Sequence, residues 1–238
     1  MKNRPEIWNG IQVPYEMSVG ELAQLAKSNA PGRWAAFVAL AHSEHDTALA
    51  PLQESADSSD PHVRRIAVEA LGVRPDGSRA AAVIIQLLAD SHEVVVRSAC
   101  EAASRQQLTE AHDAVLQLLN SSAESTRCVA VQTLRSLWRE TDFDRVLRAF
   151  TSDSSSEVKR EAAWTLQSVA SESNWQQLFA IWQADALPRH RRWAAELAGT
   201  FGNSGFLTQL ERLAQDVDGH VRDRATQAIR DLQARAVK

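Results

Sequence analysis

Apolar positions recur with helical spacing along nearly all of this 238-residue chain. The clearest stripe places five apolar residues at i, i+3, i+4, i+7 and i+8, which is one face of an α-helix: Val63, Ile66, Ala67, Ala70 and Leu71. Asp60-Pro61 precedes this stripe as a predicted N-cap and first helical residue, and Gly72 is a predicted helix stop. We call this kind of helix the B helix.

A second type of apolar stripe, here called the A helix, precedes each B stripe. Two clear examples are Phe143, Val146, Leu147 and Phe150, and Trp175, Leu178, Phe179 and Trp182. We therefore expect Trp175 and Trp182 to lie in the core. No segment shows sustained alternation of apolar and polar residues, so the sequence predicts no strands. Each unit is expected to consist of an A helix, a short Ser/Asp-rich turn, a B helix and a second short turn.

A basic residue returns in every B helix at intervals of 30 to 33 residues: Arg33, Arg64, Arg97, Arg127, Lys159, Arg191 and Arg222. Three positions later the chain has a small residue each time: Ala36, Ala67, Cys100, Ala130, Ala162, Ala194 and Ala225. A period in this range marks a repeat protein, in which each helix pair buries its apolar face against its neighbours. The small residues are expected to let successive B helices approach closely.

The segment 60–72 resembles the HEAT-like repeat of the phycobilin-lyase type, and the resemblance continues at 95–103, 158–166 and 221–229. It covers roughly residues 18–233. It implies an all-α fold: an α-solenoid of about seven HEAT-like helix pairs forming a curved right-handed superhelix, with the B helices lining the concave face. Residues 1–17 stand outside this array (18–238) and are expected to form an N-terminal extension or capping strap over the first helix pair, or else a peptide that docks on a partner.

In this repeat family the basic column resembles a structural ladder, whose arginines bind acidic or carbonyl groups of neighbouring turns. The alternative is a row that binds phosphate. An acid four residues before the ladder position is present only as Asp60, Glu93 and Asp218, which argues against a continuous Asp–Arg ladder.

The overall composition is that of a folded protein, with 44% hydrophobic and 24% charged residues and a formal net charge of −4. This charge argues against nucleic-acid binding unless a local basic patch exists. No apolar run is long enough to cross a membrane. Two cysteines, Cys100 and Cys128, fit a reducing compartment, so we expect a cytoplasmic location. The sequence contains one His-Glu pair, His92-Glu93, and a single pair cannot assemble a metal site, so we expect none. We also expect no cofactor.

Tryptophan and arginine gather on the B-helix face beside the ladder in the later units, which is expected to line the concave groove, and these residue types dominate binding hot spots. We expect a partner-binding patch made of Arg160, Trp164, Arg192, Trp193 and Glu196, with Trp34, Arg65 and Arg135 as flanking contacts. The alternative is that Trp164 and Trp193 only pack between repeats.

No catalytic motif accompanies the repeat. The leading interpretation is a protein-protein interaction or scaffold/adaptor module that holds a protein or peptide on its concave face, and it favours a non-enzyme. One alternative is a bilin lyase-like or chromophore-handling protein, with Trp164 and Trp193 stacking on a tetrapyrrole. A second is a DNA-binding solenoid resembling alkylpurine DNA glycosylases. The repeat itself occurs in lyases, chaperones, scaffolds and adaptors, so the fold cannot choose among them.

Overall fold

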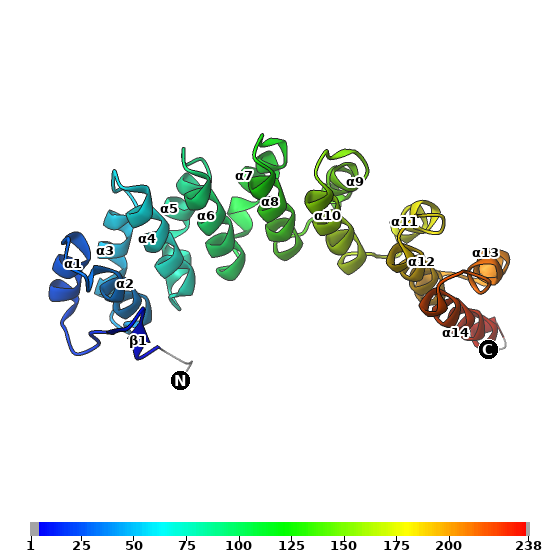
Figure 1. Cartoon of the computed structure of the whole chain (residues 1–238), viewed down its shortest axis with the longest axis horizontal. Helices are drawn as coiled ribbons and strands as arrows, with labels where there is room; N and C mark the ends of the chain where they lie inside the picture. Colours follow the sequence, from blue (N-terminus) through cyan, green and yellow to red (C-terminus); the bar gives the residue numbers. More distant parts are fainter. Residues whose placement is uncertain (1–4, 237–238) are drawn as a thin grey trace. The chain divides into compact units, whose positions relative to one another are not determined.

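Seven A/B helix pairs make up most of the chain in the computed structural model, which describes residues 5–236 (Figure 1). The A helices are α1 (Val19–Lys27), α3 (Leu49–Ser55), α5 (Ala81–Leu87), α7 (His112–Gln117), α9 (Phe143–Ser152), α11 (Trp175–Trp182) and α13 (Leu207–Leu213). The B helices are α2 (Arg33–His42), α4 (Pro61–Val73), α6 (Glu93–Arg105), α8 (Glu124–Ser136), α10 (Ser156–Ser168), α12 (Pro188–Phe201) and α14 (Gly219–Ala236). The predicted α-solenoid of helix pairs is confirmed.

Short 3₁₀ turns lie next to most of the A helices. They are η1 (Asp46–Ala48), η2 (Gly77–Ala80), η3 (Thr109–Ala111), η4 (Leu118–Asn120), η5 (Glu140–Asp142) and η6 (Ser204–Phe206).

The helices form where the apolar stripes predict them. Trp175 and Trp182 are buried in the core, as expected. Asp60 caps α4 by accepting a hydrogen bond from the backbone N–H of His62, and Pro61 is the first helical residue. The prediction for Gly72 is wrong, because α4 continues through it to Val73.

Gly72 instead lets two B helices approach closely. A Cβ atom built at Gly72 would lie 2.9 Å from the Cα and Cβ atoms of Ala102 on α6. A glycine also allows close helix packing in α12, where a Cβ at Gly199 would lie 2.9 Å from the Cβ of Ala228 on α14. Small residues thus bring successive B helices into backbone contact.

Residues 5–17 contain two short antiparallel strands, β1 (Ile7–Trp8) and β2 (Ile11–Gln12), so the prediction of no strands is wrong. Two-residue strands are too short to show an alternating pattern. The turn between them was readable, however: Asn9-Gly10 is a typical hairpin turn, and both residues have positive φ, 48° and 78°. The hairpin contacts α2, the first B helix. Its role as a capping strap stays a prediction.

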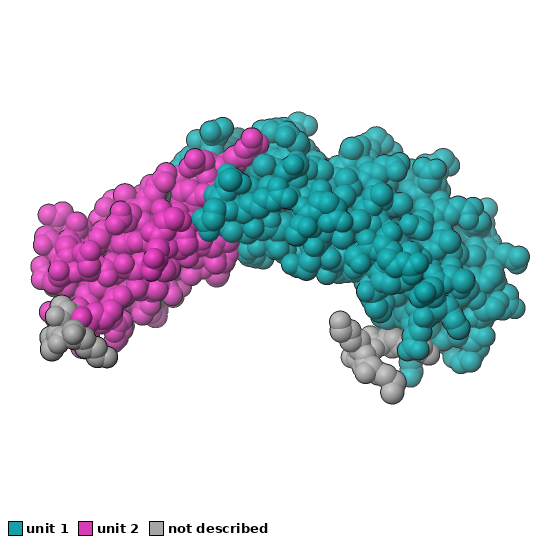
Figure 2. Space-filling model, turned by 180° about the vertical axis from the view of Figure 1, so that it is seen from behind, with its two compact units in different colours: residues 1–142, 148–162 teal, residues 143–147, 163–238 magenta. Residues whose placement is uncertain are grey.

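The chain divides into two compact units, coloured separately in Figure 2. The first unit comprises residues 1–142 and 148–162, in which α2, α4, α6 and α8 pack side by side in chain order. The second comprises residues 143–147 and 163–238, in which α12 packs against α11 and α14. Each unit is treated separately below.

Candidate functional site

The turn before each later B helix is closed by a hydroxyl or carboxylate side chain, which accepts a hydrogen bond from the backbone N–H two residues further on. The residues that form this turn column are Ser58, Asp90, Ser121, Asp153, Asp185 and Asp216. The column recurs once per repeat and sets the entry into the B helix.

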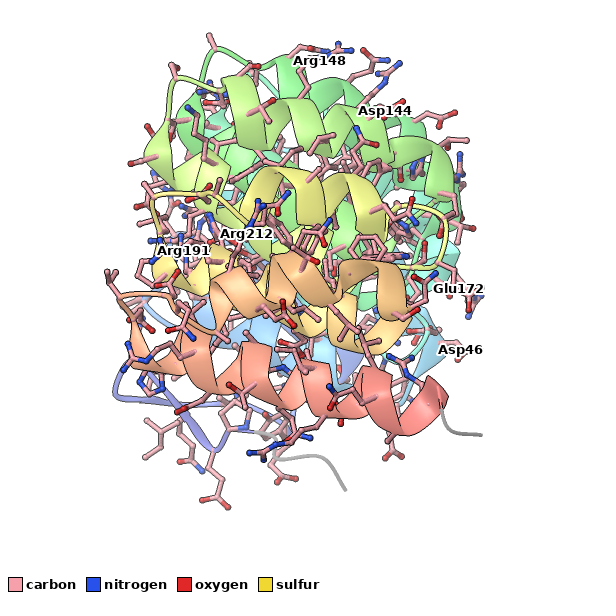
Figure 3. The ribbon with its side chains drawn as sticks, turned by 90° about the vertical axis from the view of Figure 1, so that its right-hand side faces the viewer. Asp46, Asp144, Arg148, Glu172, Arg191 and Arg212 are labelled. Carbon is pink, nitrogen blue, oxygen red and sulfur yellow. The ribbon has the colours of Figure 1, made fainter. Side chains whose placement is uncertain are left out.

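Three ladder arginines bind the carboxylates of this column in the following repeat. Arg64 donates from Nε and Nη2 to Asp90 at 2.6 and 2.9 Å. Arg127 binds Asp153 at 2.8 and 2.9 Å. Arg191, labelled in Figure 3, binds Asp216 at 2.7 and 2.8 Å.

The Nη1 atom of each of these arginines donates to two carbonyls of its own turn; for Arg64 these are Ser58 and Ser59. The acid that pairs with each of these arginines therefore lies 25 or 26 residues after it, and not four residues before it as expected from the sequence. At least four of the five N–H groups of each of these arginines are used within the protein, which argues against a row that binds phosphate.

The electrostatics of the ladder are those of a structural element. The guanidinium of Arg64 lowers the pKa of Asp90, chiefly through its hydrogen bonds, and the pKa of Arg64 is raised in return. Arg97 differs from the three paired arginines. It is exposed and has no hydrogen bond or ion pair with any described residue, because it stands five residues after the N-cap of its helix, whereas Arg64, Arg127 and Arg191 stand four after theirs. The buried Val96 takes the ladder position in α6.

The most conspicuous surface feature of the second unit is Trp164, on α10. Its side chain is 45% exposed, which is rare for so large an apolar group. The ring packs edge-on against Trp193 of α12, with centroids 5.2 Å apart and planes at 69°. Trp193 is only 3% exposed and packs in turn on Trp182 and His190. Trp164 is therefore a partly exposed ring held on a rigid aromatic base.

The expectation that Trp193 itself touches a partner is corrected by this burial. Its ring fills the space between α11 and the start of α12, so it can only support Trp164. Two polar residues of the predicted patch do lie on the surface of α12. Arg192 is exposed and has no ion pair or hydrogen bond with any described residue. Glu196, one turn later, is 3.8 Å from Arg224 of α14.

The other predicted contacts belong to the first unit. Arg160 is neutralised on its own helix by Glu157 and Glu161. Arg65 is paired with Glu69 at 2.7 Å.

The remaining two flanking residues differ in how open they are. Trp34 is half-buried, and the guanidinium of Arg33 lies 3.8 Å above its ring. Arg135 is exposed and makes no ion pair or hydrogen bond with the described residues. Among the eight predicted residues, Trp164 packs on Trp193, and Arg192 and Glu196 lie on the same helix as Trp193.

A second surface feature was missed by sequence reasoning. The hairpin and the helices α2, α4 and α6 enclose an open slot of about 240 Å³ in the first unit, lined mostly by apolar side chains. The hairpin forms one wall through Pro5 and Trp8. Its Asn9-Gly10 turn was the signal in the sequence that could have located it.

The histidines and cysteines take structural positions. Both ring nitrogens of buried His112 lie within 2.9 Å of carboxylate oxygens, from Asp113 on one side and Asp142 on the other. Burial raises the pKa of the Cys100 thiol to about 12. Burial, together with Glu124 and nearby glutamates, also raises the pKa of Cys128. Neither thiol is therefore an activated nucleophile.

No group of three or more His, Cys, Asp or Glu side chains in residues 5–236 is arranged to hold a metal ion. Within the same range, no helix is both long enough and apolar enough to cross a bilayer.

Solved structures resemble this chain in fold. An engineered protein is 18% identical, with a TM-score of 0.59 and an alignment that covers 90% of this chain and 68% of that one. The complex of CpcE and CpcF of phycocyanin lyase from Nostoc sp. PCC7120 is 14% identical, with a TM-score of 0.56 and coverage of 98% of this chain and 99% of that one. At such low identity these likenesses show the fold alone. No curated protein matches the sequence.

A family model described as HEAT repeats matches residues 21–105, 80–167 and 144–230. These overlapping matches include helix pairs of both units. The chain belongs to the HEAT-repeat family.

Proposed function

We propose that this chain is a protein-binding module that docks a protein or peptide on the B-helix face of its second unit, through Trp164, Arg192 and Glu196. The observation that supports the proposal is the exposure of Trp164 on a buried aromatic base. A ring held in this way offers a large contact area and loses little side-chain entropy on binding.

The charged residues beside the ring support directional contacts. Arg192 has no partner among the described residues, so an incoming carboxylate or carbonyl need not displace an existing pair. The nearest nitrogen of Arg224 is 3.8 Å from the carboxylate of Glu196, which is too far for a hydrogen bond. Glu196 can therefore still accept a hydrogen bond from a partner, and Arg224 can still donate one.

The two alternatives gain no specific support. The likeness to the CpcE–CpcF complex is one of fold and brings no bilin chemistry to this chain. Three arginines of the basic column, Arg64, Arg127 and Arg191, are occupied by carboxylates and carbonyls, which argues against a continuous row that binds a nucleic-acid backbone. A cytoplasmic location stays a prediction.

The test is capture of partners from an extract of the source cells by the immobilised chain, followed by affinity measurement with the purified partner. Trp164→Ala is expected to weaken binding by about 2 kcal/mol, roughly thirtyfold, and Arg192→Ala about tenfold. Val217→Ala is the matched control, because Val217 is 93% exposed in the same unit but lies on a turn. Equal affinities for all three variants and the wild type, with circular dichroism showing that each is folded, would remove the face from consideration.

A further inference from the structure

The slot beside the N-terminal hairpin is independent of the Trp164 face, since all its residues belong to the first unit. Its main apolar lining comes from the hairpin and two B helices: Trp8 of β1, Phe37 and Val38 of α2, and Ile66, Ala70 and Val73 of α4. With about 240 Å³ it is smaller than the 300–1,000 Å³ typical of cofactor pockets. The volume suits one large apolar side chain.

The floor of the slot is buried and its rim is open. Phe37 and Ala70 at the floor are buried, whereas Val73 is 43% and Trp8 is 36% exposed. Apolar groups that remain uncovered together around a concave floor indicate an interaction site.

The hairpin wall is fixed in place. Val13, just after β2, is buried, and its N–H donates to the carbonyl of Glu6 across the hairpin at 2.9 Å. The hydroxyl of Tyr15 donates to the carbonyl of Pro5 at 2.8 Å. Because these contacts hold the wall before any ligand arrives, binding need not order it.

The charged groups on the rim favour a cation. Glu69, Glu101 and Arg105 line the slot, which gives two carboxylates against one guanidinium. Glu69 is already bound by Arg65 at 2.7 Å and by the Ser98 hydroxyl at 2.9 Å. Glu101 and Arg105, by contrast, lie 3.9 Å apart and are each about half exposed. Glu101 is therefore free to bind a second positive charge at little cost.

We propose that this slot binds a short peptide segment of a partner protein, which inserts one leucine or phenylalanine side chain between the hairpin and α4 and places a lysine or arginine against Glu101. Most of the affinity comes from burial of the inserted apolar side chain away from water. The pairing of the cation with Glu101 makes the slot prefer apolar peptides that carry a lysine or arginine.

The test uses an array of 12-residue peptides that carry one central Leu or Phe flanked by Lys, Gln or Glu in a Gly/Ser background. Binding of the purified chain is measured by fluorescence anisotropy with labelled copies. Lys-flanked peptides are expected to bind at least tenfold more tightly than Glu-flanked ones, and peptides with a central Ala are expected not to bind. Glu101→Gln should remove the preference for Lys while the preference for Leu or Phe remains.

Two variants separate the slot from the rest of the surface. Val73→Trp fills the slot and is expected to abolish binding, whereas Val94→Trp is the matched control, because Val94 is 40% exposed on α6 and does not line the slot. If Val73→Trp is misfolded by circular dichroism, Trp8→Ala removes the opposite wall without changing a helix and is expected to weaken binding at least tenfold.

Several results would overturn the proposal: no binding of any apolar peptide, equal binding by Val73→Trp and Val94→Trp, or a preference for Glu flanks. Trp164→Ala should bind these peptides as the wild type does. Failure of the slot therefore leaves the proposed function of the second unit untouched, and the reverse also holds.

Discussion

Removing one ladder carboxylate tests whether the ladder fastens one repeat to the next. Asp90 is the best choice, because its side chain is 6% exposed and that of its partner Arg64 is 13% exposed. The carboxylate accepts two hydrogen bonds from Arg64, at 2.6 and 2.9 Å, and one from the backbone N–H of His92 at 2.8 Å. Asp90→Ala deletes all three, leaves Nε of Arg64 without an acceptor and leaves Nη2 with only the ring nitrogen of His92, 3.4 Å away.

The expected loss follows from these contacts. A hydrogen bond to a charged group contributes about 1.5–3 kcal/mol, and breaking a buried ion pair costs about 3–5 kcal/mol. Since Nη1 of Arg64 keeps its two carbonyl partners and water can reach the vacated site, we expect a loss near the lower limit, about 3 kcal/mol in the free energy of unfolding. Asp90→Asn keeps one acceptor oxygen and should lose about half as much.

The assay is urea denaturation followed by circular dichroism at several pH values. The Arg64 hydrogen bonds hold the pKa of Asp90 below its ordinary value of 3.8, so the pair's contribution is fully present well above pH 3.8 and is lost as pH falls through the lower folded pKa. The gap between wild type and Asp90→Ala should therefore be full at pH 7 and shrink below about pH 4. A gap under about 0.5 kcal/mol at pH 7, or one that stays constant down to pH 3, would refute the reasoning.

Two further substitutions test other features. Gly72→Ala should lower the midpoint of thermal unfolding, because the overlap of its Cβ with Ala102 costs about 1–3 kcal/mol and outweighs a helix-propensity gain of about 1 kcal/mol; a higher midpoint would mean that the helices can separate freely. Gly10→Ala should destabilise the hairpin by about 1 kcal/mol, since Gly10 has a φ of +78°, and faster amide exchange in residues 7–12 would show it, whereas unchanged exchange would argue against the turn.

Much of the fold could be read from the sequence, since the 30-residue period and the two helical stripes are local patterns. The helical spacing within one helix does not reveal the acid that pairs with a ladder arginine, because this acid lies in the turn of the following repeat. The recurring Asp90, Asp153, Asp185 and Asp216 carry that signal at the period of the repeat itself. An acid that recurs at the period of the repeat therefore indicates the partner of the ladder arginine.

The site was predicted only in part. Trp164 is exposed as expected, but a helical wheel of one helix cannot say that Trp193 is covered, because that depends on how closely α11 approaches α12. The slot beside the hairpin depends on three helices and a turn that are distant in sequence, so no single stripe reveals it.

The absence of a ladder arginine from α6, where Val96 stands at the position of Arg64 and Arg127, makes one joint of the first unit differ from its neighbours. The joint between α4 and α6 is clamped by a carboxylate–guanidinium pair, whereas at the joint between α6 and α8 the corresponding end is linked by the hydroxyl of Ser125 to Glu93 at 2.7 Å. A neutral donor resists bending less than a bidentate ion pair does. Bending of the first unit should therefore occur more easily between α6 and α8 than between α4 and α6. Such bending would change the spacing between the B helices on either side of that joint.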